Sequence, residues 1–211
     1  MIYLLTDEKY DGVLNYPVIK INFLSVSPDF RGVDFLLFTS KNGVRAIDRV
    51  NDEWKRIPSL VIGDGTKEEV LKRGGKIEYI AKNSYGDEFA KEIDKKYKGK
   101  NILFFRAKKI ISNITFKNNI LKEVIVYETK CNKPENNLKK PSIVIFSSPS
   151  TVKCFSKIED FKEIIPVAIG KKTKKTLLDY FKENEIFMPS KPSIKKCIEL
   201  AKSLYSNDQK N

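Results

Sequence analysis

The stretch VIVYET, residues 124–129, lies between two copies of one longer sequence pattern. Its alternation predicts a β-strand with Val124 and Val126 on one side and Ile125 and Tyr127 on the other. The two copies read, ahead of this stretch, DFLLFTSKNGV (34–44) and SLVIGDGTKEEVLKRG (59–74), and after it PSIVIFSSPSTV (141–152) and IPVAIGKKTKKTLLDYF (165–181). We interpret this repeat as an internal duplication, with VIVYET close to the point where the chain passes from one copy to the other.

Short apolar runs alternate with helical periodicity through both copies. Strands are predicted at 2–5, 35–39, 60–63, 76–80, 101–105, 143–147, 167–169 and 186–188. Helices are predicted to start near Ser40, Thr66, Ser84, Ser148, Thr173 and Ile194, the helix from Thr173 reaching residue 182 and the last one residue 205. Strands that alternate with helices predict the α/β class, with doubly wound parallel sheets.

The order of these segments predicts two flavodoxin-like lobes. The second copy lacks a counterpart of the strand at 101–105 unless the run at 2–5 supplies it. We therefore expect a continuous lobe at 28–121 and a discontinuous lobe formed by 1–17 with 133–211. Residues 18–27 and 122–132 then cross between the lobes, and two antiparallel connecting strands predict a hinge.

The composition indicates a basic, folded protein. The 211 residues carry a formal net charge of +13, and 41% of them are hydrophobic. Residues 1–100 hold 18 basic and 16 acidic side chains, whereas 101–211 hold 22 and 11, so the later part carries +11 of the total. This balance suits an anionic partner, although much of the lysine can equally be solvated surface.

Several classes of site are excluded or disfavoured by residue usage. The chain has no histidine, which excludes imidazole bases, His metal ligands and Ser-His or Cys-His pairs. Cys131, Cys154 and Cys197 show no C-x-x-C spacing, so we expect reduced thiols of a cytoplasmic protein, with neither a disulfide nor a zinc site. No apolar run is long enough for a membrane span, and the apolar start is too short for a signal peptide.

Hydroxyl residues mark the four strand-to-helix turns, with Ser40, Thr66, Ser148 and Thr173 as candidate ligand contacts. In parallel sheets such turns lie at the carboxyl ends of the strands, where amides at helix N-termini bind anions. Each residue can equally be a plain N-cap, and Thr66 with Glu69 fits a capping box. The glycine spacings of phosphate loops are missing, which argues against a nucleotide cofactor.

Tyr127 is the one tyrosine in the VIVYET strand. A strand tyrosine commonly serves packing, with its hydroxyl at an edge. Because histidine is absent, a phenol is also one of few groups left that can donate a proton near a hinge.

The segments FTSKNGV, VIGDGT, VIVYET, FSSPSTV and AIGKKT, in this order, resemble the signature segments of the uroporphyrinogen-III synthase family over residues 34–205. The resemblance implies two doubly wound lobes joined by a two-stranded ladder. It also implies a cofactor-free and metal-free lyase that cyclises hydroxymethylbilane to uroporphyrinogen III with inversion of ring D. We also expect a cytoplasmic monomer that takes its substrate from hydroxymethylbilane synthase.

The resemblance also assigns roles to residues. Tyr127 falls on the family's cleft tyrosine, which assists departure of the hydroxyl from ring A. The azafulvene that results reacts with ring D at its substituted position, and a spiro intermediate fragments and recloses. Side chains expected to hold the substrate carboxylates are Ser40, Thr66, Ser148, Thr173, Lys41, Lys171, Lys172 and Arg106.

The sequence departs from the family in two places, and two other functions compete. The helix usual after the first strand is replaced by about a dozen irregular residues, and the arginine-glycine turn after 101–105 reads RAKK, residues 106–109. A two-lobed polyanion-binding or regulatory domain without turnover is the main alternative. Nucleic-acid binding is disfavoured, because aromatic residues fall within strands and helices and do not interleave with lysine on an exposed face.

Overall fold

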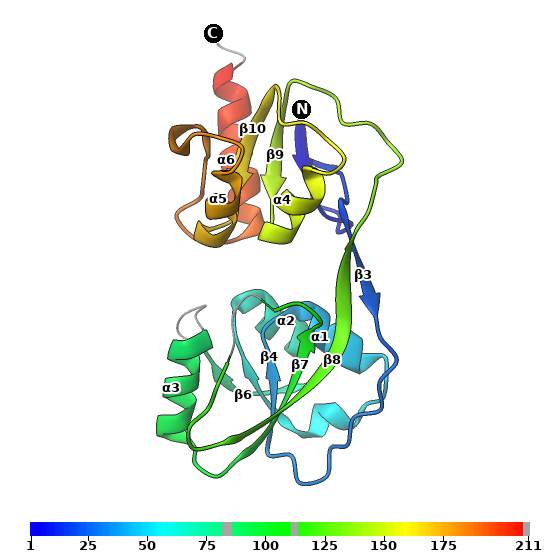
Figure 1. Ribbon diagram of the computed structural model, residues 1–211, viewed down its shortest axis with the longest axis vertical. Coiled ribbons are helices and arrows are strands. Elements are labelled where there is room, and N and C mark those ends of the chain that lie inside the picture. Colours follow the sequence, from blue (N-terminus) through cyan, green and yellow to red (C-terminus); the bar gives the residue numbers. More distant parts are fainter. Residues whose placement is uncertain (82–85, 111–113, 209–211) are drawn as a thin grey trace. The chain divides into compact units, whose positions relative to one another are not determined.

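The computed structural model describes residues 1–81, 86–110 and 114–208, and the predicted helix start at Ser84 lies outside these residues. The chain forms two compact units. Unit 1 consists of Met1–Lys20 with Lys130–Asn211, and unit 2 of Ile21–Thr129. Each unit is a sheet with helices packed on it (Figure 1). The predicted α/β class with doubly wound parallel sheets is confirmed.

Unit 2 contains a six-stranded sheet in the order β3-β8-β7-β4-β5-β6. The strands from β8 to β6 are parallel. Its elements are β3 (Ile19–Phe23), β4 (Phe35–Phe38), α1 (Lys41–Asp48), η1 (Glu53–Arg56), β5 (Pro58–Val61), α2 (Asp64–Lys72), β6 (Lys76–Ile80), α3 (Gly86–Lys96), β7 (Asn101–Ala107) and β8 (Ile120–Cys131). Strand β3 begins, and β8 ends, within unit 1.

Both faces of this sheet are covered because its central strands are apolar on both sides. Phe38 and Phe105 face a core that includes Val44 of α1 and Val70 of α2. The alternate strand residues face a second core, which Phe89 of α3 completes. Helices α1 and α2 therefore cover one face and α3 covers the other.

Unit 1 contains a four-stranded parallel sheet in the order β10-β9-β1-β2. Its elements are β1 (Ile2–Leu4), β2 (Leu14–Asn15), β9 (Ser142–Phe146), α4 (Pro149–Phe155), β10 (Ile164–Ala168), α5 (Lys171–Leu177), η2 (Glu183–Glu185) and α6 (Ile194–Asp208). Strand β1 pairs with β9 as β7 pairs with β4, so the predicted role of the first strand is confirmed.

The unit 1 sheet is covered by α4 and α5 on one face and by α6 on the other. The irregular segment after β1 takes part in this cover, since Tyr10 and Val13 pack against the same core as α6. The stretch that departs from the family pattern therefore fills part of the flank that a helix would otherwise cover.

The two connecting segments pair with antiparallel geometry. Within unit 2 the amide of Leu24 donates to the carbonyl of Val126 at 3.0 Å. Within unit 1 the amide of Asn132 donates to the carbonyl of Val18 at 2.8 Å. Residue numbers rise along one segment as they fall along the other, which is the pattern of an antiparallel ladder.

Two predicted elements of unit 1 are shorter than expected. Helix α5 ends at Leu177, and the following Tyr180 and Phe181 pack on Phe161 with ring centroids 4.3 and 5.3 Å away. The predicted strand at 186–188 is a single bridge from Phe187, because the proline that follows at 189 has no amide to extend the ladder. Conversely, α6 runs to Asp208, so the predicted polar tail at 206–211 begins in helix.

The expectation of three reduced cysteines is wrong. Cys131 and Cys154 form a disulfide with their Cα atoms 5.1 Å apart, and Cys197 is a buried free thiol. The pair has no short sequence spacing, because the fold brings the end of β8 to α4 across a loop that separates the two by 23 residues. Within the described ranges, no helix is long and apolar enough to cross a membrane.

Candidate active site

Two strand-to-helix turns lie side by side at the carboxyl edge of the unit 2 sheet. Phe38 of β4 lies opposite Val61 of β5, and the amide of Ile62 donates to the carbonyl of Phe38 at 3.0 Å. The chain then enters α1 after Ser40 and α2 after Gly63. This edge therefore presents the N-termini of two helices, which favour a negative charge.

Ser40 caps α1 just after β4 ends. Its backbone is extended, and its Oγ accepts a hydrogen bond from the amide of Asn42 at 3.2 Å. Lys41 is the first residue of the helix. A Cβ at Gly43 would lie 2.8 Å from the carbonyl oxygen of Phe105, so a glycine is needed for α1 to begin this close to β7.

Tyr127 on β8 is 7% exposed, and its phenol hydrogen bonds with the side chain of Ser40. Burial raises the pKa of Tyr127, and the hydrogen bond with Ser40 offsets part of this increase. The phenol is therefore protonated at neutral pH and can donate a proton. The structure brings together two of the residues that the sequence singled out, the candidate acid and the cap of α1.

A β-bulge sets the direction of Tyr127. Arg106 of β7 lies opposite Ile125, but the next residue, Ala107, lies opposite Tyr127, so Val126 is the extra residue. Val126 and Tyr127 consequently lie in the same core cluster, and the predicted strict alternation of the strand is wrong at this point. Bulges commonly re-aim a side chain next to a functional site.

Thr66 does not cap α2, so the predicted capping box with Glu69 is wrong. The helix begins at Asp64 after Gly63, whose φ of 87° favours glycine. Thr66 is the third helical residue, it is buried, and its amide donates to the carbonyl of Gly63 at 3.1 Å.

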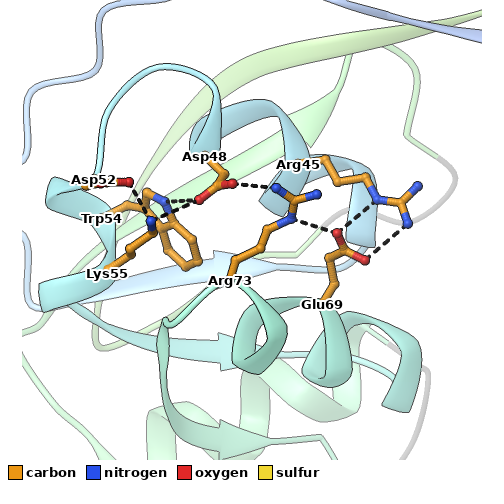
Figure 2. Close-up of polar contacts among 7 residues, drawn as sticks. All are labelled: Arg45, Asp48, Asp52, Trp54, Lys55, Glu69 and Arg73. Atoms are coloured by element: carbon orange, nitrogen blue, oxygen red, sulfur yellow. Dashed lines mark hydrogen bonds and ion pairs between the residues drawn. The ribbon is translucent and has the colours of Figure 1, made fainter.

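Glu69 instead joins α1 to α2 through an ion-pair network (Figure 2). It accepts hydrogen bonds from Arg45 at 3.0 and 3.1 Å and from Arg73 at 2.7 Å. Arg73 also donates to Asp48, which accepts a hydrogen bond from the indole of Trp54 at 3.3 Å. Burial raises the pKa of Glu69, but the hydrogen bonds from the two arginines hold it below its ordinary value. These arginines therefore bind a carboxylate of the protein itself.

Unit 1 repeats the first turn at Ser148. Strands β9 and β10 are neighbours with Phe146 opposite Ala168, and the amide of Ile169 donates to the carbonyl of Phe146 at 3.0 Å, as at the matching point of unit 2. Ser148 and Thr151 form a reciprocal capping box. The amide of Ser148 donates to Oγ1 of Thr151, and the amide of Thr151 donates to Oγ of Ser148, each at 3.2 Å. Thr151 is not among the residues predicted from the sequence, because capping boxes usually carry Glu or Gln at that position.

Unit 1 also repeats the second turn, at Gly170. Thr173 is the third residue of α5, it is buried, and its amide donates to the carbonyl of Gly170 at 3.0 Å. The predicted cap at Thr173 is therefore wrong, in the same way as at Thr66. Lys171 and Lys172 are exposed in the first turn of the helix.

Arg106 uses its guanidinium locally. Nε donates to Glu123 at 2.8 Å, and Nη1 donates to the carbonyl of Ala107 at 2.9 Å. Both partners belong to β7 and β8, the two strands that frame the bulge.

The sequence-derived residues near the strand-to-helix turns fall into two candidate sites, one in each unit. The unit 2 site consists of Tyr127, Ser40, Lys41 and Thr66, and the unit 1 site of Ser148, Thr173, Lys171 and Lys172. Among the described residues, no cluster of Cys, Asp or Glu has the arrangement of a metal site.

Comparison with known proteins identifies the family. A sequence model described as uroporphyrinogen-III synthase HemD matches residues 12–199. The chain belongs to the uroporphyrinogen-III synthase family. The resemblance inferred from the turn motifs is thereby confirmed, while no curated protein matched the sequence significantly.

Solved structures of the uroporphyrinogen-III synthase family share this fold. The uroporphyrinogen-III synthetase of Helicobacter pylori is 22% identical, with a TM-score of 0.77 over 96% of this chain and 98% of that one. A mutant uroporphyrinogen III synthase of the extremely thermophilic bacterium Thermus thermophilus is 12% identical, with a TM-score of 0.56 over 100% of this chain and 99% of that one. The α/β topology is therefore shared along the whole chain.

Proposed function

We propose that this member of the uroporphyrinogen-III synthase family converts hydroxymethylbilane to uroporphyrinogen III, as a cyclising hydro-lyase without a cofactor. The observation that carries the proposal is the buried phenol of Tyr127 beside Ser40, the cap of α1, at the carboxyl edge of a parallel sheet. Ligands of open α/β sheets usually bind at this edge.

In the first step Tyr127 is the general acid. Its phenol protonates the hydroxyl group on the terminal methylene of ring A, the carbon–oxygen bond breaks, and water leaves. The substrate becomes an azafulvene cation and the tyrosine a phenolate, which the hydrogen bond with Ser40 stabilises. Ring closure finally releases a proton from a pyrrole carbon, and this proton restores the phenol. The net change is therefore the loss of one water molecule.

The inversion of ring D depends on positioning. The azafulvene carbon bonds to the substituted position of ring D, and the resulting spiro intermediate fragments and recloses with ring D reversed. The bilane can also cyclise unaided to the unrearranged isomer, so the enzyme must hold the geometry that makes the spiro route faster.

The many carboxylates of the substrate suit the remaining groups of both sites. In unit 1, Lys171 and Lys172 are exposed beside the turn amides, and in unit 2 Lys41 lies next to the cap. The buried hydroxyls of Thr66 and Thr173 follow the two glycine turns. Arg106 binds Glu123 in the structure, and its guanidinium adds positive charge for the carboxylates at the same edge of the unit 2 sheet.

The proposal also covers the boundaries of the lobes, the cellular compartment, the oligomeric state and the source of the substrate. Residues 28–121 and 1–17 with 133–211 act as the two functional lobes, and 18–27 and 122–132 connect them. The enzyme works as a cytoplasmic monomer that takes hydroxymethylbilane from hydroxymethylbilane synthase. Its charge of +13 supports rapid capture of an anionic substrate.

The proposal is tested by incubating the purified protein with hydroxymethylbilane generated in place, oxidising the products and separating the uroporphyrin isomers. Predominantly isomer III is the expected product. Isomer I alone, formed at the rate of the protein-free control, would overturn the proposal and leave a binding domain of the same fold.

A further inference from the structure

The disulfide lies where β8 ends in unit 1. Cys131 is the last residue of β8 and is exposed, whereas Cys154 lies in α4 and is 6% exposed. Their Cα atoms are 5.1 Å apart, a separation that a disulfide spans without backbone movement. The bond thus joins the end of the connecting strand to the helix that Ser148 caps.

Contacts other than the disulfide hold both cysteines in place. Next to Cys131, the amide of Asn132 donates to Val18 at 2.8 Å and its side chain to Pro17 at 2.7 Å. Cys154 is fixed by the capping box of α4 and by its place in the unit 1 core. We therefore expect the two thiols to stay opposed after reduction, so that the bond can open and close without refolding.

The three cysteines differ in reactivity. Cys131 is exposed, so a disulfide in solution can reach it. Cys154 is covered, so it is reached mainly through Cys131. Burial raises the pKa of Cys197 to about 12, which makes that thiol inert. Cys197 is consequently a built-in control for reactivity.

Unit 1 has an apolar core of its own besides the disulfide. Two apolar clusters cover the two faces of its sheet, which is unlike the small, disulfide-dense domains that lack a sufficient core. A disulfide that supplements a core and has one exposed cysteine is open to exchange.

We propose that Cys131 and Cys154 form a reversible thiol–disulfide pair, in which Cys131 reacts first and Cys154 resolves the adduct. The co-reactant is a low-molecular-weight disulfide. The Cys131 thiolate attacks one of its sulfur atoms and releases one small thiol. The Cys154 thiolate then attacks the Cys131 sulfur and releases the second small thiol. Two protein thiols are oxidised to one disulfide, and one small disulfide is reduced to two thiols.

The oxidation state of the pair sets the mobility of the unit 1 site. When the bond is closed, α4 is covalently joined to the end of β8, and the Ser148 cap is held with it. When the bond is open, hydrogen bonds and packing alone hold the helix. This proposal does not rest on the proposed activity, because its readouts are protein mass, thiol count and amide exchange.

The exchange chemistry is tested by treating the fully reduced protein with excess glutathione disulfide and following its mass and thiol count. Wild type should lose two hydrogens and keep one thiol, at Cys197. Cys154→Ser should gain one glutathione at Cys131, and Cys131→Ser should react about tenfold more slowly than wild type. Cys197→Ser should close the disulfide as wild type does.

Two outcomes of this experiment would overturn the proposal. One is a wild-type protein that accumulates the glutathione adduct without closing the disulfide, and the other is a Cys131→Ser variant that reacts as fast as wild type. Amide hydrogen exchange of α4 provides a second test. Amide exchange should be faster in the reduced protein than in the oxidised one. Equal rates would contradict the proposal that the disulfide restrains α4.

Discussion

Units 1 and 2 build the same pair of turns but hold the capped helix by different means. In unit 2, the ion-pair network around Glu69 joins α1 to α2. In unit 1, the Cys131–Cys154 disulfide joins α4 to the end of β8. The local sequence pattern therefore determines the turns, whereas contacts distant in sequence determine how firmly each helix is held.

The two units also differ in the chemistry of their sites. The unit 2 site contains the buried phenol of Tyr127 with its partner Ser40. In the unit 1 site the cap, Ser148, is bonded to Thr151, and lysines stand at the second turn. We therefore assign proton transfer to unit 2 alone, whereas the lysines of both units bind carboxylates.

The largest effect on stability should come from removing the disulfide. Replacing Cys131 and Cys154 with serine should lower the free energy of unfolding of unit 1 by about 3 kcal/mol, because a loop of this length gains entropy in the unfolded chain. Trp54, the one tryptophan, is buried in unit 2. Its fluorescence midpoint in denaturant should therefore stay constant while the circular dichroism transition of unit 1 shifts.

The reduced protein provides the control for this prediction. In the presence of a thiol reductant, wild type and the double variant should unfold alike. The Trp54 fluorescence midpoint could instead fall as much as the circular dichroism midpoint. That result would show that the disulfide stabilises both units and would contradict the prediction that it stabilises unit 1 alone.

The next largest effect should come from Glu69→Gln in unit 2. The change leaves Arg45 and Arg73 without their shared carboxylate and should cost about 2 kcal/mol, read from Trp54 fluorescence in denaturant. Glu68→Gln on the same helix is the matched control, since Glu68 is exposed. Equal midpoints for the two variants would contradict a stabilising role for the network.

Acid should weaken unit 2 through the same carboxylate. The folded-state pKa of Glu69 lies below its ordinary value, so its stabilisation is present above the unfolded pKa and is lost as the pH falls through the folded pKa. Trp54 midpoints measured at successively lower pH should therefore fall more steeply in wild type and Glu68→Gln than in Glu69→Gln. If the midpoints of all three proteins fell equally with pH, Glu69 would not be the cause of the acid destabilisation of unit 2.

The smallest effect should come from the cap of α4. Ser148→Ala removes one acceptor at the helix N-terminus and should cost about 1 kcal/mol in unit 1, measured by circular dichroism. Ser148→Asp should keep most of this stability, because aspartate also caps helices. A loss as large in the aspartate variant as in the alanine variant would point to packing as the cause.

Most of the fold could be predicted from the sequence, because strand, turn and helix signals are local. The second sequence copy lacks a counterpart of the strand at 101–105, which predicts that the first strand joins its sheet, and β1 does pair with β9 of unit 1. The helix starts predicted at Thr66 and Thr173 are wrong, because α2 begins after Gly63, whose positive φ favours glycine, and α5 begins after Gly170, whose backbone is extended. A threonine can cap a helix with its side-chain hydroxyl and a glycine cannot, so the sequence favours Thr66 and Thr173 over the preceding glycines.

The rest of the site depends on contacts between distant segments. The bulge at Val126 has no glycine or proline to mark it, so simple alternation was the natural prediction. The disulfide was missed because the spacing of Cys131 and Cys154 matches no motif, and only the fold brings them together. The hydrogen bond between Tyr127 and Ser40 likewise joins β8 to the turn after β4, two strands that β7 separates.

The division of labour between the units is tested most directly by the steady-state kinetics of Tyr127→Phe and Lys171→Ala with hydroxymethylbilane as substrate. We expect Tyr127→Phe to lower kcat for isomer III about 100-fold at nearly constant KM, because a general acid acts in the transition state. Lys171→Ala should raise KM at nearly constant kcat. A wild-type kcat in Tyr127→Phe would contradict the assignment of proton transfer to unit 2.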